Sequence, residues 1–312
     1  MSRVLSLSLN PALDLSIALD ALTPGEVNRA RDSTLTPAGK GNNVARVLAL
    51  HGHQTAAGGF LGRDNSAPFE RAFADWGVED RFVRVAGETR INVKLAEKGG
   101  RVTDINGPGA TVGEHEFEQL IERVSNEGEG LEAVVIAGSL PPGVTPLQLA
   151  SLIERLGAAG YPVWFDASGA ALAEGVKARP FLIKPNEHEL ADCVGRALDD
   201  EAALIEAALE VQRDGVDQVL LSLGAEGVIW LFEGGGLRAR APKVEVVSTV
   251  CAGDTLLAGV LHGALAGWPR EKTLGYATAL SADAVRRIGV GRAQAPDFEA
   301  LREAVRIEEL PT

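Results

Sequence analysis

Residues 246–259 combine small residues and an acid at the predicted start of a helix. Residues 246–250 are mostly β-branched and apolar, which predicts a strand, and the segment after Asp254 predicts an apolar helix. The first amides of a helix have no acceptor within the helix and lie at the positive end of its dipole. Because Ala252 and Gly253 have little bulk, a phosphate could approach those amides, while Asp254 could take a proton from a hydroxyl group. An ordinary acid at a helix N-terminus would look the same.

Two earlier segments carry residues suited to hydroxyl groups and to anions. Asp14 follows a predicted first strand, residues 4–9, where it could bind hydroxyls or simply stabilise a turn. The Gly39-Lys40-Gly41 turn allows close backbone approach, adds a positive charge and precedes a predicted helix. It is not a nucleotide P-loop, because glycine follows the lysine. Such a turn is also common without any function.

Two other segments have polar residues at informative spacing. Arg90, Asn92 and Lys94 alternate with apolar residues, so a strand would place all three on one face, toward a substrate or toward water. Asn186 and Glu189 follow a predicted strand, residues 181–184, and lie three apart. They could orient a hydrated magnesium ion or form a helix capping box, and the spacing alone favours the cap.

The composition restricts the possible partners. Lys and Arg number 30 against 43 Asp and Glu, and the net charge of −13 opposes binding to nucleic acid or to an anionic membrane. An anionic substrate therefore needs locally placed cations. Cys193 and Cys251 lack metal-binding or disulfide-framework spacing, which predicts a reduced, cytoplasmic protein. Residues 256–268, the longest apolar segment, are too few to cross a membrane, and residues 1–14 lack a secretion signal.

A short strand is predicted at residues 79–85, and predicted helices and strands alternate from residue 113 onward. The alternating part includes predicted strands at residues 131–137, 162–166 and 218–222 and a predicted helix at about residues 146–158. This pattern predicts one domain, residues 1–312, in which helices cover both faces of a mostly parallel sheet, a three-layer α/β/α fold. Short strands with polar alternate positions, within residues 14–36 and 88–106, would form a separate four-stranded sheet over one end. A nicotinamide-dependent dehydrogenase shares the alternation, but the first strand is not followed by Gly-x-Gly-x-x-Gly.

Six ordered segments resemble the ribokinase-like (PfkB) family of carbohydrate kinases across nearly the whole chain. They are residues 10–14, 39–43, 89–94, 138–141, 184–190 and 249–254. Within the family the chain is most similar to the phosphosugar branch, which includes 1-phosphofructokinases, tagatose-6-phosphate kinases and a 6-phosphofructokinase. The resemblance implies Mg²⁺-dependent, ATP-dependent phosphorylation of a ketohexose monophosphate. D-fructose 1-phosphate is the first expectation, and D-tagatose 6-phosphate or fructose 6-phosphate are the alternatives.

The resemblance also implies roles for individual residues. Asp254 would be the general base, and the anion-hole motif would begin at Cys251 and include the amides of Ala252 and Gly253. Lys40 and Arg90 would bind the phosphate already on the substrate. The other sugar-side residues would be Asp14, Gly39, Gly41, Asn42, Asn43, Asn92 and Ser139.

The nucleotide side and the small sheet have implied roles as well. Asn186 and Glu189 would hold magnesium, through water. The small sheet would be a lid over the sugar and the interface of a homodimer. The nucleotide-side residues would be Lys184, Asn186, Ser222, Gly224, Gly227 and Thr249.

The chain departs from the family pattern at two positions, because Cys251 and Ala38 stand where glycine is usual. The Cys251 side chain could narrow the anion hole, or its thiol could gain thiolate character at the helix N-terminus and become sensitive to oxidation. A small residue that packs locally is the favoured alternative. Because Cys251 replaces the usual glycine, the alternative also remains that the protein binds a sugar phosphate without catalysing a reaction.

Overall fold

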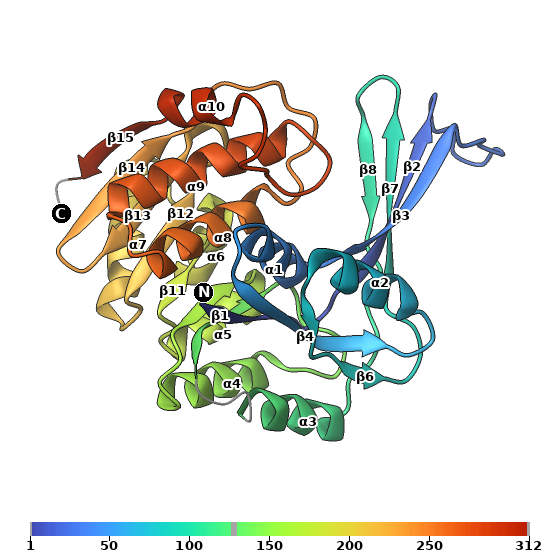
Figure 1. Cartoon of the computed structure of the whole chain (residues 1–312), viewed down its shortest axis with the longest axis horizontal. Coiled ribbons are helices and arrows are strands. Elements are labelled where there is room, and N and C mark those ends of the chain that lie inside the picture. The colour runs from blue at the N-terminus through green and yellow to red at the C-terminus, as the bar shows by residue number, and fades with distance from the viewer. Residues whose placement is uncertain (1, 126–129, 311–312) are drawn as a thin grey trace.

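The computed structural model describes residues 2–125 and 130–310, which form two sheets flanked by helices (Figure 1). The larger sheet has eleven strands within these residues. They are β1 (Arg3–Ser8), β4 (Gln54–Gly62), β5 (Glu79–Asp80), β6 (Val83–Val85), β9 (Leu131–Ala137), β10 (Val163–Asp166), β11 (Leu182–Ile183), β12 (Gln218–Ser222), β13 (Val228–Phe232), β14 (Gly235–Arg240) and β15 (Arg306–Leu310).

The centre of the large sheet is parallel. Its strands lie in the order β15-β14-β13-β12-β11-β10-β9-β1-β4-β5, with β6 also paired to β4, and only β13, β14 and β15 run antiparallel to their neighbours. In β9, Val134 and Ile136 join one core cluster while Ala133 and Val135 join another. The strand is therefore buried on both faces, as its continuous apolar sequence predicts.

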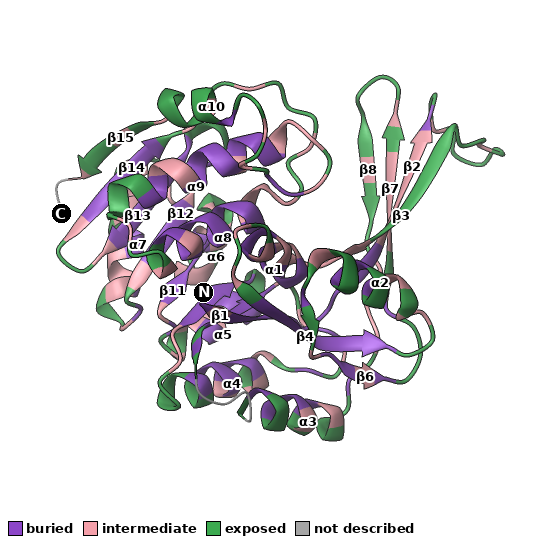
Figure 2. Cartoon of the chain, in the orientation of Figure 1, coloured by how far each residue is buried: buried purple, intermediate pink, exposed green. Residues whose placement is uncertain are grey.

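Helices cover the two faces of this sheet, and their inward sides are buried (Figure 2). One face carries α3 (Glu114–Ser125), α4 (Pro146–Ala158), α5 (Gly169–Lys177), α6 (Glu187–Val194) and α7 (Glu201–Arg213). The other face carries α1 (Lys40–Leu50), α8 (Ala252–Leu265), α9 (Arg270–Val285) and α10 (Phe298–Ala304). The helix α2 (Ala67–Trp76) packs with β4 and α1 in a smaller cluster. The predicted three-layer fold is confirmed, and no helix in the described residues is long and apolar enough to span a membrane.

The small sheet projects from one end of the large one (Figure 1). It contains β2 (Ala12–Leu19), β3 (Asp32–Ala38), β7 (Ile91–Glu97) and β8 (Val102–Ile105), in the order β3-β2-β7-β8. Asp14 is paired in register with Asn92 and Leu15 with Val93, so polar and apolar side chains lie on opposite faces. The predicted separate four-stranded sheet is confirmed.

Several predicted elements were wrong or missing. Residues 246–250 form no strand, because the amides of Val247 and Ser248 both donate to the carbonyl of Val285 at the end of α9. The segment is thus bonded to the end of a helix, and its valines are exposed. A β-branched composition therefore predicts a strand only in a suitable tertiary context. The single strand expected at residues 79–85 is divided into β5 and β6, and neither α5 nor β15 was predicted.

Candidate active site

The N-terminus of α8 offers free amides. Cys251 lies at the N-cap with φ 68°, and the amide of Ala252 makes a long bond to the Thr249 carbonyl, at 3.4 Å. The amides of Gly253 and Asp254 have no acceptor among the described residues. These two N–H groups, rather than the predicted pair from Ala252 and Gly253, are therefore available to an anion.

Asp254 is a buried acid directly beside these amides. Its side chain is 5% exposed, and Asn43 Nδ2 donates to its Oδ2 at 2.7 Å. Burial, followed by the charge of Asp166, raises the pKa of Asp254 to about 6, while Lys40, Asn43 and Lys184 oppose the shift. A carboxylate with this pKa is ionised at neutral pH and is still basic enough to accept a proton.

Asp166, at the end of β10, is the central residue that the sequence analysis missed. It is 1% exposed, and its two oxygens make ion pairs with Lys40 Nζ at 3.0 Å and Lys184 Nζ at 3.2 Å. Burial alone would raise the pKa of Asp166, but the charges of Lys184 and Lys40 outweigh burial and lower it. Its position in the sequence could have revealed it, because Asp166 lies at the carboxyl end of a predicted parallel strand, where ligands of such sheets bind.

The two lysines are thereby brought to the N-terminus of α8. A Cβ built on Gly253 would lie 3.2 Å from Lys184 Nζ, so glycine leaves the ammonium room beside the free amides. Burial would lower the pKa of Lys40, but Asp166 and then Asp254 raise it, so Lys40 remains charged. Both cations therefore lie near the acid and the amides, although Lys40 was predicted to bind the phosphate on the substrate.

The loop around Gly39 fits tightly against the first strand. Gly39 has φ 138°, and a Cβ on Gly41 would lie 2.5 Å from the Leu7 carbonyl oxygen. Asn42 is fully buried, and its side-chain amide donates to the Ala38 carbonyl at 3.1 Å. Gly41 and Asn42 therefore hold the loop in place, and Asn43 is the residue of this group that contacts Asp254.

The polar face of the small sheet continues the site. Asn92 Nδ2 donates to Asp14 Oδ1 at 3.1 Å, and Lys94 Nζ lies 3.8 Å from Asp14 Oδ2. This is the polar row predicted from residues 89–95, with Asp14 added from the neighbouring strand.

Arg90 joins the small sheet to the loop that contains Ser139. Its guanidinium donates to the carbonyls of Asn10 at 2.7 Å, Gly107 at 3.1 Å and Pro11 at 3.3 Å, and to Ser139 Oγ at 3.3 Å. These bonds use four of the five N–H groups of an arginine. Arg90 thus positions Ser139 and the end of β1, and it retains one N–H for a ligand.

The predicted nucleotide-side residues lie mainly at the ends of β11 and β12. Asn186 caps α6 and forms a full capping box with Glu189, so the alternative favoured by their spacing is confirmed. Asn186 also bridges to Ser222, whose Oγ donates to the Pro185 carbonyl. A Cβ on Gly227 would lie 1.9 Å from the Ala239 carbonyl oxygen, which excludes any larger residue.

The other residues of this group lie elsewhere or are exposed. Gly224 begins the short 3₁₀ helix η1 (Gly224–Glu226) with φ 54°, and Thr249 is exposed in the loop before α8. Lys184 faces Gly253 and Asp166.

Cys251 adopts the left-handed conformation that explains why glycine suits this position. Burial, then the charges of Asp254 and Asp14, raises the pKa of its thiol to about 12. Burial and these carboxylates favour the neutral thiol, so they oppose the expected gain in thiolate character. The side chain packs against the core cluster around α8, in agreement with the alternative of a locally packed residue.

Two ammonium groups and free helix amides around a buried carboxylate suit phosphoryl transfer, and the two-sheet architecture is that of the ribokinase-fold kinases. The protein is a phosphotransferase of this class. More narrowly, the chain belongs to the PfkB family, because the model of the pfkB family carbohydrate kinases matches residues 7–297.

Individual relatives support the same assignment. The chain is 43% identical to 1-phosphofructokinase of Vibrio cholerae, over 99% of this chain and 97% of that protein. It is 41% identical to 1-phosphofructokinase of Escherichia coli, over 98% of each. A solved structure of the tetrameric inhibited form of phosphofructokinase-2 from Escherichia coli matches with a TM-score of 0.89 and 28% identity, covering 97% of this chain and 99% of that one.

Proposed function

We propose that the protein is a Mg·ATP-dependent 1-phosphofructokinase, which converts D-fructose 1-phosphate to fructose 1,6-bisphosphate. The observation that carries the proposal is the buried Asp254 with a pKa of about 6, beside free amides and near two lysines. The two relatives named 1-phosphofructokinase support the choice of substrate. D-tagatose 6-phosphate and fructose 6-phosphate are the alternative substrates.

In the proposed reaction, Asp254 accepts the proton of the sugar C6 hydroxyl as that oxygen attacks the γ-phosphorus of ATP. The bond between the γ-phosphorus and the bridging oxygen breaks, and ADP leaves with the bond electrons. The amides of Gly253 and Asp254 stabilise charge on the transferring group. Asn43 holds the carboxylate in position through its bond to Oδ2.

The cations have separate roles in this proposal. Lys40 and Lys184 are held by Asp166 next to the α8 N-terminus, so we assign both to the phosphoryl group in transfer. Arg90, with its remaining N–H group and its contact to Ser139, binds the phosphate already on the sugar. Asp14 and Asn92, on the facing strands, bind sugar hydroxyl groups.

The residues present also fit magnesium, held mainly by water and phosphates. No group of three or more His, Cys, Asp or Glu side chains among the described residues could hold a metal ion. Mg²⁺ needs few protein ligands, because it usually keeps several waters and binds one or two carboxylates plus phosphates. Glu189 uses Oε2 in the capping box, so its Oε1 can accept from a metal-bound water. When bound, magnesium would neutralise charge on the ATP phosphates.

We also propose a homodimer formed through the small sheet. Leu35, Leu15, Val93 and Ile105 are paired in one row across all four strands, on the face opposite Asp14. Leu35 is 45% exposed and Ile105 56% exposed, although such a row is normally covered. A second copy of the same face would cover it.

Steady-state ADP production with Mg·ATP tests the function. The panel contains fructose 1-phosphate, fructose 6-phosphate, tagatose 6-phosphate and free fructose, compared by kcat/KM. We expect the highest value for fructose 1-phosphate, whereas a preference for a 6-phosphate would reassign the substrate. Preference for free fructose would contradict the role of Arg90, and turnover with none of them would favour a silent binding protein.

A further inference from the structure

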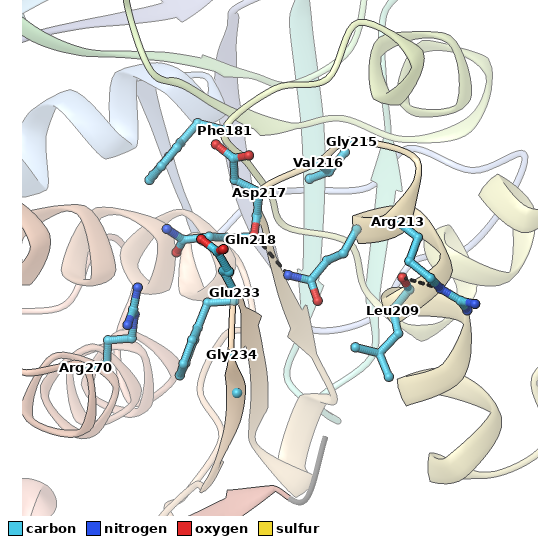
Figure 3. A pocket seen from close by; sticks show the side chains of 13 residues that line it. Phe181, Leu209, Arg213, Gly215, Val216, Asp217, Gln218, Glu233, Gly234 and Arg270 are labelled. Atoms are coloured by element: carbon cyan, nitrogen blue, oxygen red, sulfur yellow. Dashed lines mark hydrogen bonds between the residues drawn. The ribbon is translucent and has the colours of Figure 1, made fainter.

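Helix α9 lies directly behind the first turn of α8. A Cβ built on Gly263 would meet Thr273, and one built on Gly259 would lie 2.8 Å from Ala277 Cα, so the two helices run antiparallel with their backbones in close contact. The start of α9 is remote from the active site, since Arg270 lines an open hollow beside the amino-terminal ends of β11 and β12 (Figure 3). The last turns of α9 therefore lie against the start of α8.

Ser281, near the end of α9, makes a hydrogen bond across to α8. Its Oγ donates to the carbonyl oxygen of Ala252, the first residue of α8, at 3.0 Å. A serine inside a helix more often bonds a carbonyl of its own helix or faces water. In an α-helix the first carbonyl accepts from the amide four residues later, so Ser281 reaches the second lone pair of this oxygen. The bond therefore adds to the hydrogen bonding of α8 rather than replacing part of it.

The Ala252 carbonyl and the Gly253 amide belong to one peptide group. This group is planar, so the position of the oxygen fixes the direction of the N–H on its other side. The Gly253 amide is one of the two at the start of α8 that have no acceptor among the described residues. Hydrogen bonds in series also polarise one another, so a hydroxyl that donates to the oxygen makes this N–H a stronger donor. Ser281 thus acts on an amide that is available to an anion.

The loop after α9 holds the two helices together at this point. The Gly291 amide donates to Thr255 Oγ1 at 3.3 Å, and the Arg292 amide donates to Asp283 Oδ2 at 2.8 Å. Thr255 on α8 and Asp283 on α9 are both fully buried. One loop therefore ties the start of α8 to the end of α9 and restricts movement between the two helices.

We propose that Ser281 is a positioning residue for phosphoryl transfer. Its hydroxyl directs and polarises the Gly253 amide toward the charge that develops on the transferring phosphoryl group, without touching either substrate. The inference rests on the proposed kinase function of this site. The alternative is a bond between helices that has no effect on the amide, and it predicts a change in stability alone.

Ser281→Ala tests the role by removing only the hydroxyl. We expect kcat to fall about three- to tenfold, because a donor to the transition state is weakened rather than lost. The KM values for the sugar phosphate and for Mg·ATP should stay within about twofold, since the amide binds the transition state more strongly than the ground state. Ser281→Thr keeps the hydroxyl and should restore kcat.

Thr278→Val is the matched control. Thr278 lies one turn earlier on α9, is 2% exposed, and its Oγ1 has no hydrogen-bond partner among the described residues. Its replacement also removes one hydroxyl from α9 but should leave kcat unchanged. Thermal midpoints show that each variant is folded. Ser281→Cys, whose S–H donates only weakly, replaces Ser281→Ala if that variant does not fold.

A second measurement does not depend on turnover. In heteronuclear NMR spectra, inorganic phosphate should shift the Gly253 amide resonance, and Ser281→Ala should raise the phosphate Kd about threefold while Thr278→Val leaves it unchanged. Equal kcat and phosphate Kd values for these two variants would overturn the proposal. So would a rise in KM as large as the fall in kcat, or a Gly253 resonance that phosphate does not shift. If the wild-type protein turns over no sugar phosphate, the proposed function fails, and the phosphate Kd alone decides the role of Ser281.

Discussion

Asn43 and Asp254, which are 211 positions apart in the sequence, are joined by a hydrogen bond of 2.7 Å from Nδ2 to Oδ2. The bond links the loop at the start of α1 to the first turn of α8. It opposes the effect of burial on the pKa of Asp254, which is nonetheless raised to about 6. The basicity of the proposed catalytic carboxylate thus depends on contacts between distant segments.

The first prediction concerns the pH dependence of activity. Asp254 must be ionised to accept a proton, so kcat/KM should fall about tenfold per pH unit below about 6. Because the sugar phosphate also titrates in this range, Asn43→Leu provides the comparison. This substitution removes a hydrogen bond that lowers the pKa of Asp254. The pH at which kcat/KM begins to fall should therefore be higher in the variant, while the ionisation of the substrate is the same for both proteins. If kcat/KM falls over the same pH range in both proteins, Asp254 is not the general base.

Asp254→Asn should lower activity and increase stability. Loss of a general base lowers kcat by about 10²- to 10⁴-fold. The folded-state pKa of Asp254 lies above its usual value, so the ionised carboxylate destabilises the fold above pH 6, and this cost disappears as pH falls toward 4. Replacement should therefore raise the free energy of unfolding at pH 7.5 by about 1–3 kcal/mol. Urea unfolding at pH 7.5 and 4.5 should show a gain that is smaller at the lower pH.

Asp166→Asn should destabilise the protein and reduce turnover. The substitution leaves the ammonium groups of Lys40 and Lys184 without their shared carboxylate. Breaking a buried pair from one side costs about 3–5 kcal/mol. The control is Glu174→Gln, in the partly exposed pair with Lys177, which should change stability by less than about 1 kcal/mol. Equal unfolding free energies for the two variants would show that Asp166 does not hold the lysines.

Cys251 should be unreactive and replaceable by glycine. With its pKa raised to about 12, the thiol should react with iodoacetamide at pH 7.5 far more slowly than an ordinary cysteine, and hydrogen peroxide should leave full activity. Peptide mapping separates its labelling from that of Cys193. Cys251→Gly should retain activity, because φ 68° suits glycine, whereas Cys251→Val should destabilise by about 1–2 kcal/mol more. Rapid inactivation by peroxide that Cys251→Gly prevents would contradict this view.

The proposed dimer predicts a sharp difference between two substitutions on β8. Ile105→Glu places a charge in the apolar row and should give a monomer in sedimentation velocity. Val102→Glu is the matched control, because Val102 is 58% exposed on the same strand but lies on the opposite face, paired with Ala96. It should remain dimeric. If Ile105→Glu is also dimeric, the interface lies elsewhere.

Local sequence determined much of the fold and part of the site. The strands at Leu131–Ala137 and Gln218–Ser222 and the helix at Pro146–Ala158 have the predicted bounds, because each has a strong periodic or continuous apolar pattern and clear ends. The Asn186 and Glu189 capping box was likewise predictable, since capping depends on residues three apart.

Tertiary structure decided the rest. The ion pairs of Asp166 join the ends of strands and a helix far apart in the chain, and no local pattern contains them. Residues 246–250 have a composition that favours a strand, but they form hydrogen bonds to the carbonyl at the end of α9 instead. Long-range pairing here overrides β propensity. The pKa of Cys251 is raised because Asp14 and Asp254 come close to it in the fold. The sequence therefore determined which residues could do the chemistry, while burial and charges between distant segments decided their basicity and their partners.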